Sequence, residues 1–309
     1  MAFLILFSDL NPKNWVKYLR RQDPDLDLRI WPEVGDPAEI RFALTWKHPP
    51  GELRNYPNLA CIASLGVGVD HILRDPDLPP GVPITRVVDP SMAQGMTEYV
   101  VMAVLNHCRQ TADYFRHQQA AEWKIHIPML ADRIGVGILG LGQLGADAAQ
   151  RLTALGFNVA GWSRSRKTLD KIASYWGGDQ LGAFLSRTDI LICLLPLTPD
   201  TRDILNAELF SGLRPGAFLV NPARGEHLVE DDLLAALDGG RLGGACLDVF
   251  RTEPLPPGHP FWTHPKITIT PHVASLTNPA AVVPRIYDNY RRVLSGQAPL
   301  YTIDRTRGY

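Results

Sequence analysis

The chain has 309 residues, a length that favours two domains over one. It carries 31 basic and 32 acidic residues, so its formal charge of −1 gives no basic excess of the kind that binds nucleic acid. Its residues are 45% hydrophobic, yet no apolar run approaches the roughly 18–20 residues that a membrane span needs. The composition therefore predicts an ordinary soluble globular protein.

The first element is an apolar run over residues 2–7, which soon meets Asp9 and has no basic leader. That pattern favours a first strand over a signal peptide. The four cysteines are widely spaced in apolar surroundings and form no C-x-x-C pair: Cys61, Cys108, Cys193 and Cys246. Such spacing is typical of buried reduced thiols in a cytoplasmic protein, and it predicts no metal site.

Short apolar runs alternate with helical stretches along most of the chain. The runs predict strands near residues 2–7, 27–31, 41–45, 60–64 and 84–87, and later near 158–162, 189–194, 216–220, 244–248 and 267–270. Helices are expected over residues 92–108 and 146–155 and from Pro284 onward. This alternation predicts an α/β protein with two doubly wound parallel sheets, one flavodoxin-like and one Rossmann-like, and a cleft between them.

A glycine motif lies at the end of the apolar run that closes near residue 139. It reads Gly140-x-Gly142-x-x-Gly145 and is followed by a helical stretch. In a strand–turn–helix unit, the first glycine allows the tight turn, the second lets the backbone approach a pyrophosphate, and the third lets the helix pack closely on the sheet. The motif therefore predicts a dinucleotide site at a helix N-terminus. Because it begins so late, the N-terminal third must belong to another domain.

The turn after the next strand, which ends at Trp162, is basic. Its residues are Ser163, Arg164, Ser165, Arg166 and Lys167. An NAD-specific site would place a carboxylate here to accept from the ribose 2′-hydroxyl. Arginine, lysine and hydroxyl groups instead suit a 2′-phosphate, so the turn predicts NADPH in preference to NADH. A solvated basic turn is the alternative.

Three polar residues follow predicted strands, at the edge where open α/β sheets bind ligands. Arg224 comes shortly after the strand near 216–220, Glu253 after the strand near 244–248, and His272 after the strand near 267–270. Each alone is unremarkable as a surface or loop residue. Their shared position beside a dinucleotide motif makes them candidate catalytic residues.

At this point the chain resembles a known family, the D-2-hydroxyacid dehydrogenases. The matching stretches are Ser64-Leu-Gly-Val-Gly-Val-Asp-His-Ile72, the glycine motif, residues 195–201, residues 221–225, residues 247–253 and residues 270–274. They occur in the family's order and cover nearly the whole chain. Within the family, the basic turn, the segment Trp46-Lys-His-Pro49 and the tail from Asp304 to Tyr309 look most like reductases of glyoxylate and hydroxypyruvate.

The resemblance implies roles that agree with the residue chemistry. His272 would donate a proton to the carbonyl oxygen, and a neighbouring carboxylate, Glu253, would favour its imidazolium form. Arg224 would bind the substrate carboxylate and polarise the carbonyl. The backbone N–H groups of Val67 and Gly68 would hold the carboxylate from its other side.

Other residues carry weaker expectations. Trp46 would wall the substrate pocket or be a core residue, and Asp248 would contact the nicotinamide carboxamide or simply cap its strand. The alternative for Glu253 is a solvated loop residue. The alternative for Gly66 and Gly68, which flank Val67, is a plain turn at the end of a strand. The full set of expected cofactor contacts is Met96, Thr97, Gly140, Gly142, Gln143, Leu144, Gly145, Trp162, Ser163, Arg164, Ser165, Lys167, Leu195, Pro196, Pro222, Ala223, Arg224, Asp248, His272 and Ala274.

The expected activity is thus the NADPH-dependent reduction of a small 2-oxoacid, glyoxylate or hydroxypyruvate. The substrate domain would comprise residues 1–97 and 281–309, and the NADP domain residues 98–280. One alternative is the same chemistry on a larger, sugar-derived 2-ketoacid. The other is a nucleotide-sensing corepressor, which needs no catalytic residues. A cytoplasmic homodimer, joined through the stretch 109–123, is expected by resemblance alone.

Overall fold

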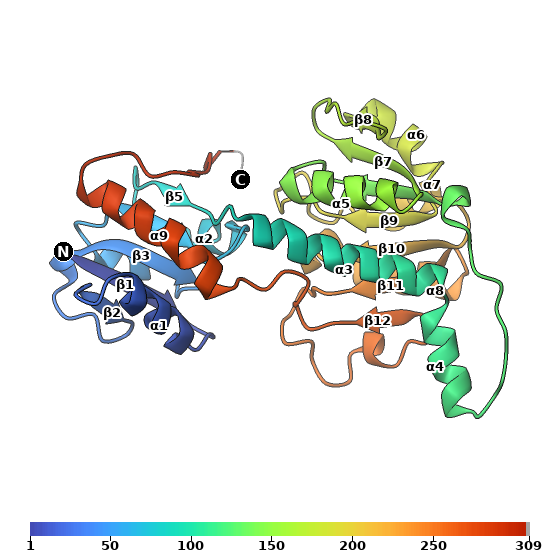
Figure 1. The fold of residues 1–309 in the computed structure, drawn as a ribbon, viewed down its shortest axis with the longest axis horizontal. Helices are drawn as coiled ribbons and strands as arrows, with labels where there is room; N and C mark the ends of the chain where they lie inside the picture. Colours follow the sequence, from blue (N-terminus) through green and yellow to red (C-terminus); the bar gives the residue numbers. More distant parts are fainter. Residues whose placement is uncertain (307–309) are drawn as a thin grey trace. The chain divides into compact units, whose positions relative to one another are not determined.

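The computed structural model describes residues 1–306, and their contacts form two compact units, each with its own parallel sheet (Figure 1). The first unit comprises Met1–Met92 and the chain from Thr277 onward, and the second comprises Ala93–Leu276. The expected domain boundaries, 97/98 and 280/281, lie a few residues further along the chain than the divisions in the structure, 92/93 and 276/277. Of the expected tail motif, residues 307–309 lie outside the described part of the chain.

The first unit has a five-stranded parallel sheet in the order β2-β1-β3-β4-β5. Its strands are β1 (Ala2–Phe7), β2 (Leu28–Ile30), β3 (Ile40–Trp46), β4 (Cys61–Ser64) and β5 (Ile84–Thr85). Its helices are α1 (Lys13–Gln22), α2 (Asp70–Leu73) and α9 (Pro279–Leu294). This is the flavodoxin-like order, in which the chain winds outward in both directions from β1.

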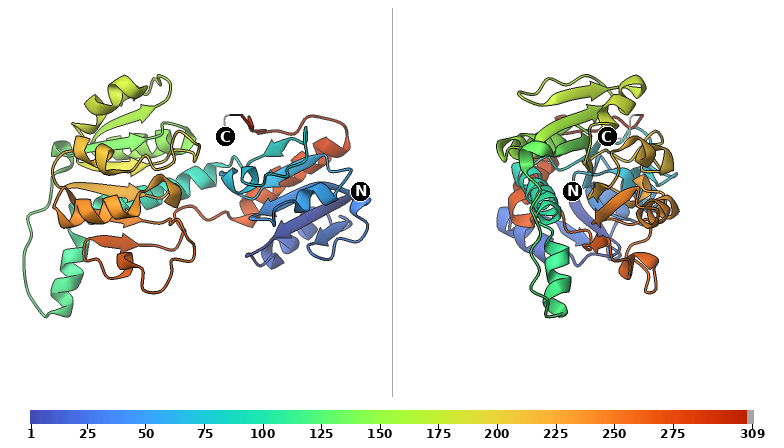
Figure 2. Two further views of the ribbon diagram at one scale, coloured as in Figure 1. Left: turned by 180° about the vertical axis from the view of Figure 1, so that it is seen from behind. Right: turned by 90° about the vertical axis from the view of Figure 1, so that its right-hand side faces the viewer.

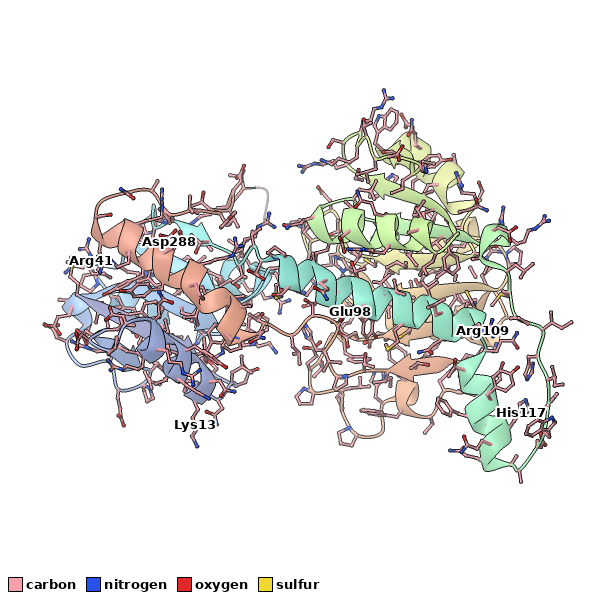
Figure 3. All side chains as sticks on the ribbon, in the orientation of Figure 1. Lys13, Arg41, Glu98, Arg109, His117 and Asp288 are labelled. Carbon is pink, nitrogen blue, oxygen red and sulfur yellow. The ribbon has the colours of Figure 1, made fainter. Side chains whose placement is uncertain are left out.

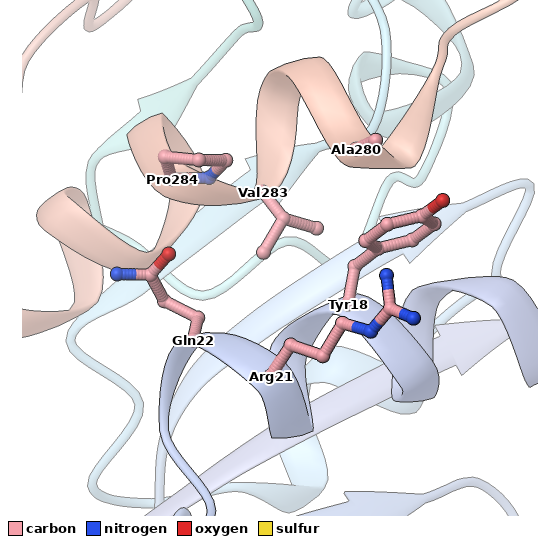
Figure 4. A pocket seen from close by; sticks show the side chains of 6 residues that line it. All are labelled: Tyr18, Arg21, Gln22, Ala280, Val283 and Pro284. Carbon is pink, nitrogen blue, oxygen red and sulfur yellow. The ribbon is translucent and has the colours of Figure 1, made fainter.

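Helices cover both faces of that sheet because the central strands are apolar on both sides. One core joins α1 and α9 to the sheet through residues such as Trp15, Leu19, Ile286 and Tyr290. Figure 1 shows these two helices side by side. A small depression between them is lined by Tyr18, Arg21, Gln22, Ala280, Val283 and Pro284 (Figure 4). None of these six residues is a predicted site residue.

The second unit has a seven-stranded parallel sheet in the order β12-β11-β10-β9-β6-β7-β8. Its strands are β6 (Gly135–Leu139), β7 (Asn158–Ser163), β8 (Ala173–Trp176), β9 (Ile190–Cys193), β10 (Ala217–Asn221), β11 (Leu242–Leu247) and β12 (Ile267–Ile269). Its helices are α4 (Thr111–Gln119), α5 (Gln143–Ala154), α6 (Leu181–Leu185), α7 (Ala207–Gly212) and α8 (Glu230–Asp238), while α3 (Pro90–Cys108) begins in the first unit and continues here.

The strand order reverses between β6 and β9, as in a Rossmann fold. One core packs α3 and α5 on one face, through Val100, Val104, Ala148 and Leu152. The other face carries α6, α7 and α8. The predicted fold class, two doubly wound α/β sheets, is therefore confirmed.

Two features differ from the sequence-based expectation, and the placement of α4 adds a third that the sequence left open. Strand β8 was not predicted, because it is an edge strand with half-exposed residues and lacks a continuous apolar run. Helix α9 begins at Pro279, not at Pro284, because the Asn278 side chain caps it by accepting from Ala280 N at 3.0 Å. Figures 1 and 2 show α4 extending away from the sheet of its own unit.

The four cysteines are free and buried, as predicted. Burial raises the pKa of the thiols of Cys61 and Cys193 to about 12 and that of Cys108 to about 11. Within residues 1–306, no helix is both long and apolar enough to cross a membrane. The same residues include no cluster of three or more His, Cys, Asp or Glu side chains suited to a metal ion.

Candidate active site

The glycine motif lies where β6 turns into α5, at the carboxyl edge of the second sheet. Gly140 has a φ of 101°, and an added Cβ would lie 2.6 Å from the carbonyl oxygen of Leu194. At Gly145 an added Cβ would lie 1.9 Å from the oxygen of Gly140, so the helix could not pack this closely on the turn with a larger residue. The space around Gly142 is open, since nothing lies within 4 Å of its missing Cβ.

The start of α5 is available to a ligand. Gly142 caps the helix without a side-chain hydrogen bond, and both Gly142 and Gln143 are exposed. The first backbone N–H groups of a helix have no acceptor inside it, and the helix dipole favours negative charge there. This arrangement fits a pyrophosphate, as the motif predicts. Leu144, by contrast, is half-buried and packs on the core behind the turn.

The basic turn follows β7 directly. Ser163 is buried, with its Oγ donating to the Ser165 carbonyl at 2.7 Å. The side chains of Arg164 and Lys167 are exposed. The guanidinium of Arg166 lies 5.2 Å from the centre of the Trp176 ring, on the unpredicted strand β8. The turn thus offers three exposed cations directly after β7, the strand that pairs with β6, and this arrangement fits a phosphate dianion.

His272 and Glu253 are brought together although 19 residues separate them. Nδ1 of His272 lies 2.9 Å from Oε2 of Glu253, and Oε1 of that carboxylate accepts from Phe250 N at 3.1 Å. The histidine side chain is 36% exposed, and no residue among 1–306 hydrogen-bonds its Nε2. A ring held at one nitrogen, with its other nitrogen accessible, is the arrangement a proton donor needs.

The loop around His272 is built on the buried side chain of Asp248. One of its oxygens accepts from Thr270 Oγ1 at 2.6 Å and Val273 N at 2.9 Å, and the other accepts from Ala274 N at 2.8 Å. His272 itself has a φ of 54°, in the left-handed region, and its N–H donates to the Asp248 carbonyl at 2.7 Å. Asp248 thus orders the loop that carries His272, and its contact with nicotinamide stays a prediction.

A deeper pair of contacts supports the same loop. The Tyr99 hydroxyl on α3 lies 2.7 Å from Thr270 Oγ1 and 3.3 Å from Cys246 Sγ. Burial raises the pKa of that tyrosine above its ordinary value, so the hydroxyl stays protonated. Tyr99 was not among the predicted residues. It directly precedes Val100 and Val101 in an apolar helix, a position that carries no sign of a role beside the site.

Arg224 lies at the end of the loop that follows β10. Its Nη1 donates to the neighbouring Ala223 carbonyl at 2.7 Å, and the side chain is half-buried. The next residue, Gly225, has no room for a Cβ, which would lie 1.9 Å from the carbonyl carbon of Phe250. This contact brings the loop of Arg224 against the loop that leads to Glu253. The sequence motif included Gly225, but gave no sign of that packing.

The remaining cofactor candidates lie around the same sheet. Pro196 is exposed, and its carbonyl accepts from Thr201 Oγ1 at 2.7 Å and lies 3.3 Å from His227 Nε2. Thr97 is buried and donates to Asp147 Oδ2 of α5 at 2.6 Å. The others are largely buried: Met96, Leu195, Pro222, Ala223 and Ala274; Trp162 is half-buried and donates through Nε1 to the Gly177 carbonyl.

The substrate candidates of the first unit lie close to one another. Trp46 ends β3, and its Cζ3 lies 3.7 Å from the position of a Cβ on Gly66. Val67 and Gly68 follow in the loop after β4, where both are half-buried. Trp46 is half-buried too and packs against the core, and its role as a wall of the substrate pocket stays a prediction. The predicted cleft between the units remains a prediction.

Comparison with known proteins places this site in a family. A family model, "D-isomer specific 2-hydroxyacid dehydrogenase, NAD binding domain", matches residues 101–274. The chain is 46% identical to a protein of Serratia proteamaculans and 44% identical to one of Photorhabdus laumondii, each named glyoxylate/hydroxypyruvate reductase A, over the full length of both chains.

Solved structures agree. A D-isomer specific 2-hydroxyacid dehydrogenase from Xanthobacter autotrophicus, in complex with NADPH and MES, is similar with a TM-score of 0.94 and 41% identity, over 100% of this chain and 99% of that one. An NADPH-dependent glyoxylate/hydroxypyruvate reductase from Sinorhizobium meliloti, in complex with NADP and sulfate, has a TM-score of 0.94 and 38% identity over all of both chains. The chain therefore belongs to the D-isomer specific 2-hydroxyacid dehydrogenases.

Proposed function

We propose that this chain is an NADPH-dependent reductase that converts a small 2-oxoacid, glyoxylate or hydroxypyruvate, to the 2-hydroxyacid. The observation that carries the proposal is the His272–Glu253 pair, 2.9 Å apart, at the carboxyl edge of the sheet that also carries the glycine motif and the basic turn. The relatives named as glyoxylate/hydroxypyruvate reductases support the choice of substrate.

The cofactor would be held by the open N-terminus of α5 and by the turn after β7. Backbone N–H groups near Gly142 and Gln143 would hold the pyrophosphate, while Arg164 and Lys167 would bind the 2′-phosphate. When bound, NADPH supplies the hydride. The other expected cofactor contacts follow β9 and β10 or lie in the loop 270–274. They would contribute to binding because they lie at the same edge of the sheet.

The chain's own residues supply the proton and the charge stabilisation. His272 donates its Nε2 proton to the carbonyl oxygen of the substrate, and Glu253 accepts from Nδ1–H and so orients the ring. Arg224 binds the substrate carboxylate and stabilises the negative charge that develops on the carbonyl oxygen. In the first unit, Trp46 and the N–H groups of Val67 and Gly68 bind the substrate as well.

A spectrophotometric assay tests this function. Purified protein is mixed with NADPH and, in turn, glyoxylate, hydroxypyruvate and a sugar-derived 2-ketoacid, and NADPH oxidation is followed by absorbance. The highest kcat/KM is expected with the small acids. A higher value with the larger acid would reassign the substrate. Tight NADPH binding without any turnover would instead favour the nucleotide-sensing alternative.

A cytoplasmic homodimer completes the proposal. Support comes from the segment that includes α4, which exposes several large apolar side chains: Met102, Tyr114, Phe115, Trp123, Ile125, Ile127 and Leu130. Figure 3 marks the segment with Arg109 and His117. Exposed apolar groups of this extent are typical of protein interfaces. The four free cysteines suit a reducing compartment. Sedimentation equilibrium tests the assembly, since a monomer at every concentration would contradict it.

A further inference from the structure

His71 joins two segments of the first unit that carry the proposed substrate residues. It lies in α2, directly after the loop that contains Val67 and Gly68. Its Nδ1 lies 3.3 Å from Lys47 N, in the segment after β3, and its Nε2 lies 3.1 Å from Ser64 Oγ, at the end of β4. The ring also contacts the Trp46 ring, with centroids 4.5 Å apart. One side chain therefore connects the ends of two neighbouring strands.

The direction of each hydrogen bond in this network can be derived. A backbone N–H only donates, so Nδ1 of His71 accepts from Lys47 and carries no proton. The ring is then neutral with its proton on Nε2, which donates to Ser64 Oγ. The hydroxyl of Ser64 donates to the Gly68 carbonyl at 2.8 Å, and its oxygen also accepts from Gly66 N at 3.2 Å. His71 thus acts on both glycines of the loop through Ser64.

The segment that His71 holds at Lys47 is strained. Lys47 has a φ of 47°, a conformation that non-glycine residues adopt at a cost and that persists only where the surroundings enforce it. A second contact enforces it from the same side. Asp75, which follows α2, lies 3.0 Å from Nε2 of the buried His48 and accepts from Gly51 N at 3.0 Å. The chain from Lys47 to Gly51 is therefore fixed at two points by α2 and the residues just after it.

We propose that His71 is a positioning residue for the 2-oxoacid. It holds the N–H groups of Val67 and Gly68 and the ring of Trp46 in one arrangement, and it does so as a neutral imidazole. This inference rests on the proposed function, in which that loop binds the substrate carboxylate. In the proposal the loop that His71 holds binds the substrate carboxylate, so the effect of His71 falls on substrate binding.

Kinetics of three variants test the role. His71→Ala removes the hydrogen bonds to Lys47 N and Ser64 Oγ, so KM for glyoxylate should rise about tenfold. The value of kcat should stay within about threefold, and NADPH affinity, followed by fluorescence, should be unchanged. His71→Asn keeps an acceptor near the position of Nδ1 and should recover part of the loss. Ser64→Ala should raise KM alone, and the double variant should be no worse than the poorer single variant, because the two residues act in one network.

His264→Ala, a histidine change on the other unit, is the matched control. An unchanged KM in folded His71→Ala would overturn the proposal. Additive effects of His71→Ala and Ser64→Ala would do so too, since they would mean that the residues act separately. If His71→Ala does not fold, His71→Asn and Ser64→Ala carry the same comparison.

Two measurements on the protein without substrate separate this inference from the proposed function. Magnetic resonance of isotope-labelled histidine rings should show His71 with a bare Nδ1 and a protonated Nε2, and His71→Asn identifies the signal. Amide hydrogen exchange over residues 65–69 should be faster in His71→Ala than in wild type or His264→Ala. A protonated Nδ1, or unchanged exchange, would refute the positioning role whether or not the protein reduces a 2-oxoacid. If the histidine signals and the exchange rates are as expected but no NADPH is oxidised, only the proposed function is refuted.

Discussion

The two ends of the seven-stranded sheet both carry ionisable side chains, but they differ in how these are bound. At the amino end, Asp189 accepts from Gly135 N at 2.7 Å and pairs with Arg214 at 3.0 Å. Nearby, the ring of His107 stacks on Phe218 with centroids 4.0 Å apart. At the carboxyl end, the part of the chain that the structure describes holds the imidazole of His272 at Nδ1 only, the ring stays partly exposed, and the cations of the turn after β7 are exposed.

The difference teaches where function can be located on such a sheet. A polar group whose atoms are all engaged inside the protein contributes to stability, whereas one that keeps an accessible atom can act on a ligand. Asp248 is a buried polar group at the carboxyl end. It acts on the site indirectly, because its carboxylate holds the loop that carries His272. Changes at the carboxyl end should therefore affect activity, and changes at the amino end should affect stability.

The largest effect is expected for His272→Gln. A general acid contributes typically about 10²–10⁴-fold, so kcat for glyoxylate reduction should fall by that order. The unfolding midpoint in urea and the affinity for NADPH should stay near the wild-type values, since the pair that the ring forms with Glu253 is partly exposed and contributes little to stability. His264→Gln is the control. Retention of most of the turnover would remove His272 from its role.

Arg224→Lys should have the next largest effect. Lysine keeps the charge but loses the planar guanidinium that can bind two oxygens at once. Removing one stabilising donor from a developing oxyanion typically costs about 10²–10³-fold in kcat. Turnover should fall accordingly, while NADPH binding in the absence of substrate, followed by fluorescence, stays close to normal. A nearly active Arg224→Lys enzyme would contradict two-oxygen binding.

Replacing Arg164 and Lys167 with alanine tests the exposed turn. Each charge-assisted contact to phosphate contributes roughly 1.5–3 kcal/mol, so KM for NADPH should rise on the order of ten- to a hundredfold per contact. KM for NADH should hardly change, because NADH has no 2′-phosphate. Arg166→Ala is the matched control and should have a smaller effect, since that guanidinium lies over the Trp176 ring. Equal losses with both cofactors would mean that the turn is structural.

Much of the fold could be predicted because buried parallel strands are continuous apolar runs. Strand β8 escaped because an edge strand has one uncovered side, and α9 began early because Asn278, not Pro284, ends the preceding loop. The positions of Arg224, Glu253 and His272 after strands were predictable, since parallel strands share one carboxyl edge. The contacts that hold these three residues in place were not predictable. The contacts of Asp248, Tyr99 and Gly225 join residues far apart in the chain, and no local pattern marks them.

At the amino end, Asp189→Ala should lower stability without changing kcat. The substitution leaves Gly135 N–H without its side-chain acceptor, and an unsatisfied buried donor costs about 1–3 kcal/mol. Asp189→Asn keeps an acceptor oxygen and should recover most of the loss, because the partly exposed pair with Arg214 contributes little. Urea unfolding measures both variants. A fall in kcat of the folded Asp189→Ala protein would break the division between the two ends.

The smallest effect is expected from protonation of His107. Burial lowers the pKa of its imidazole from 6.5 to about 4 in the folded protein. The unfolded chain therefore binds the proton more tightly, so the contribution of the neutral ring to stability is complete above the unfolded pKa and is lost as the pH falls from about 6.5 toward 4. Between about pH 7.5 and 5.5 this group alone should lower the free energy of unfolding by about 1 kcal/mol.

The control for that prediction is His107→Phe, which keeps a ring to stack on Phe218 but cannot be protonated. The difference in unfolding free energy between the variant and wild type should grow in favour of the variant as the pH falls through this range. A constant difference would show that the folded protein binds a proton at His107 as tightly as the unfolded chain does. The amino end of the sheet would then accept a new charge at no cost in stability, and the division between the two ends would fail at this residue.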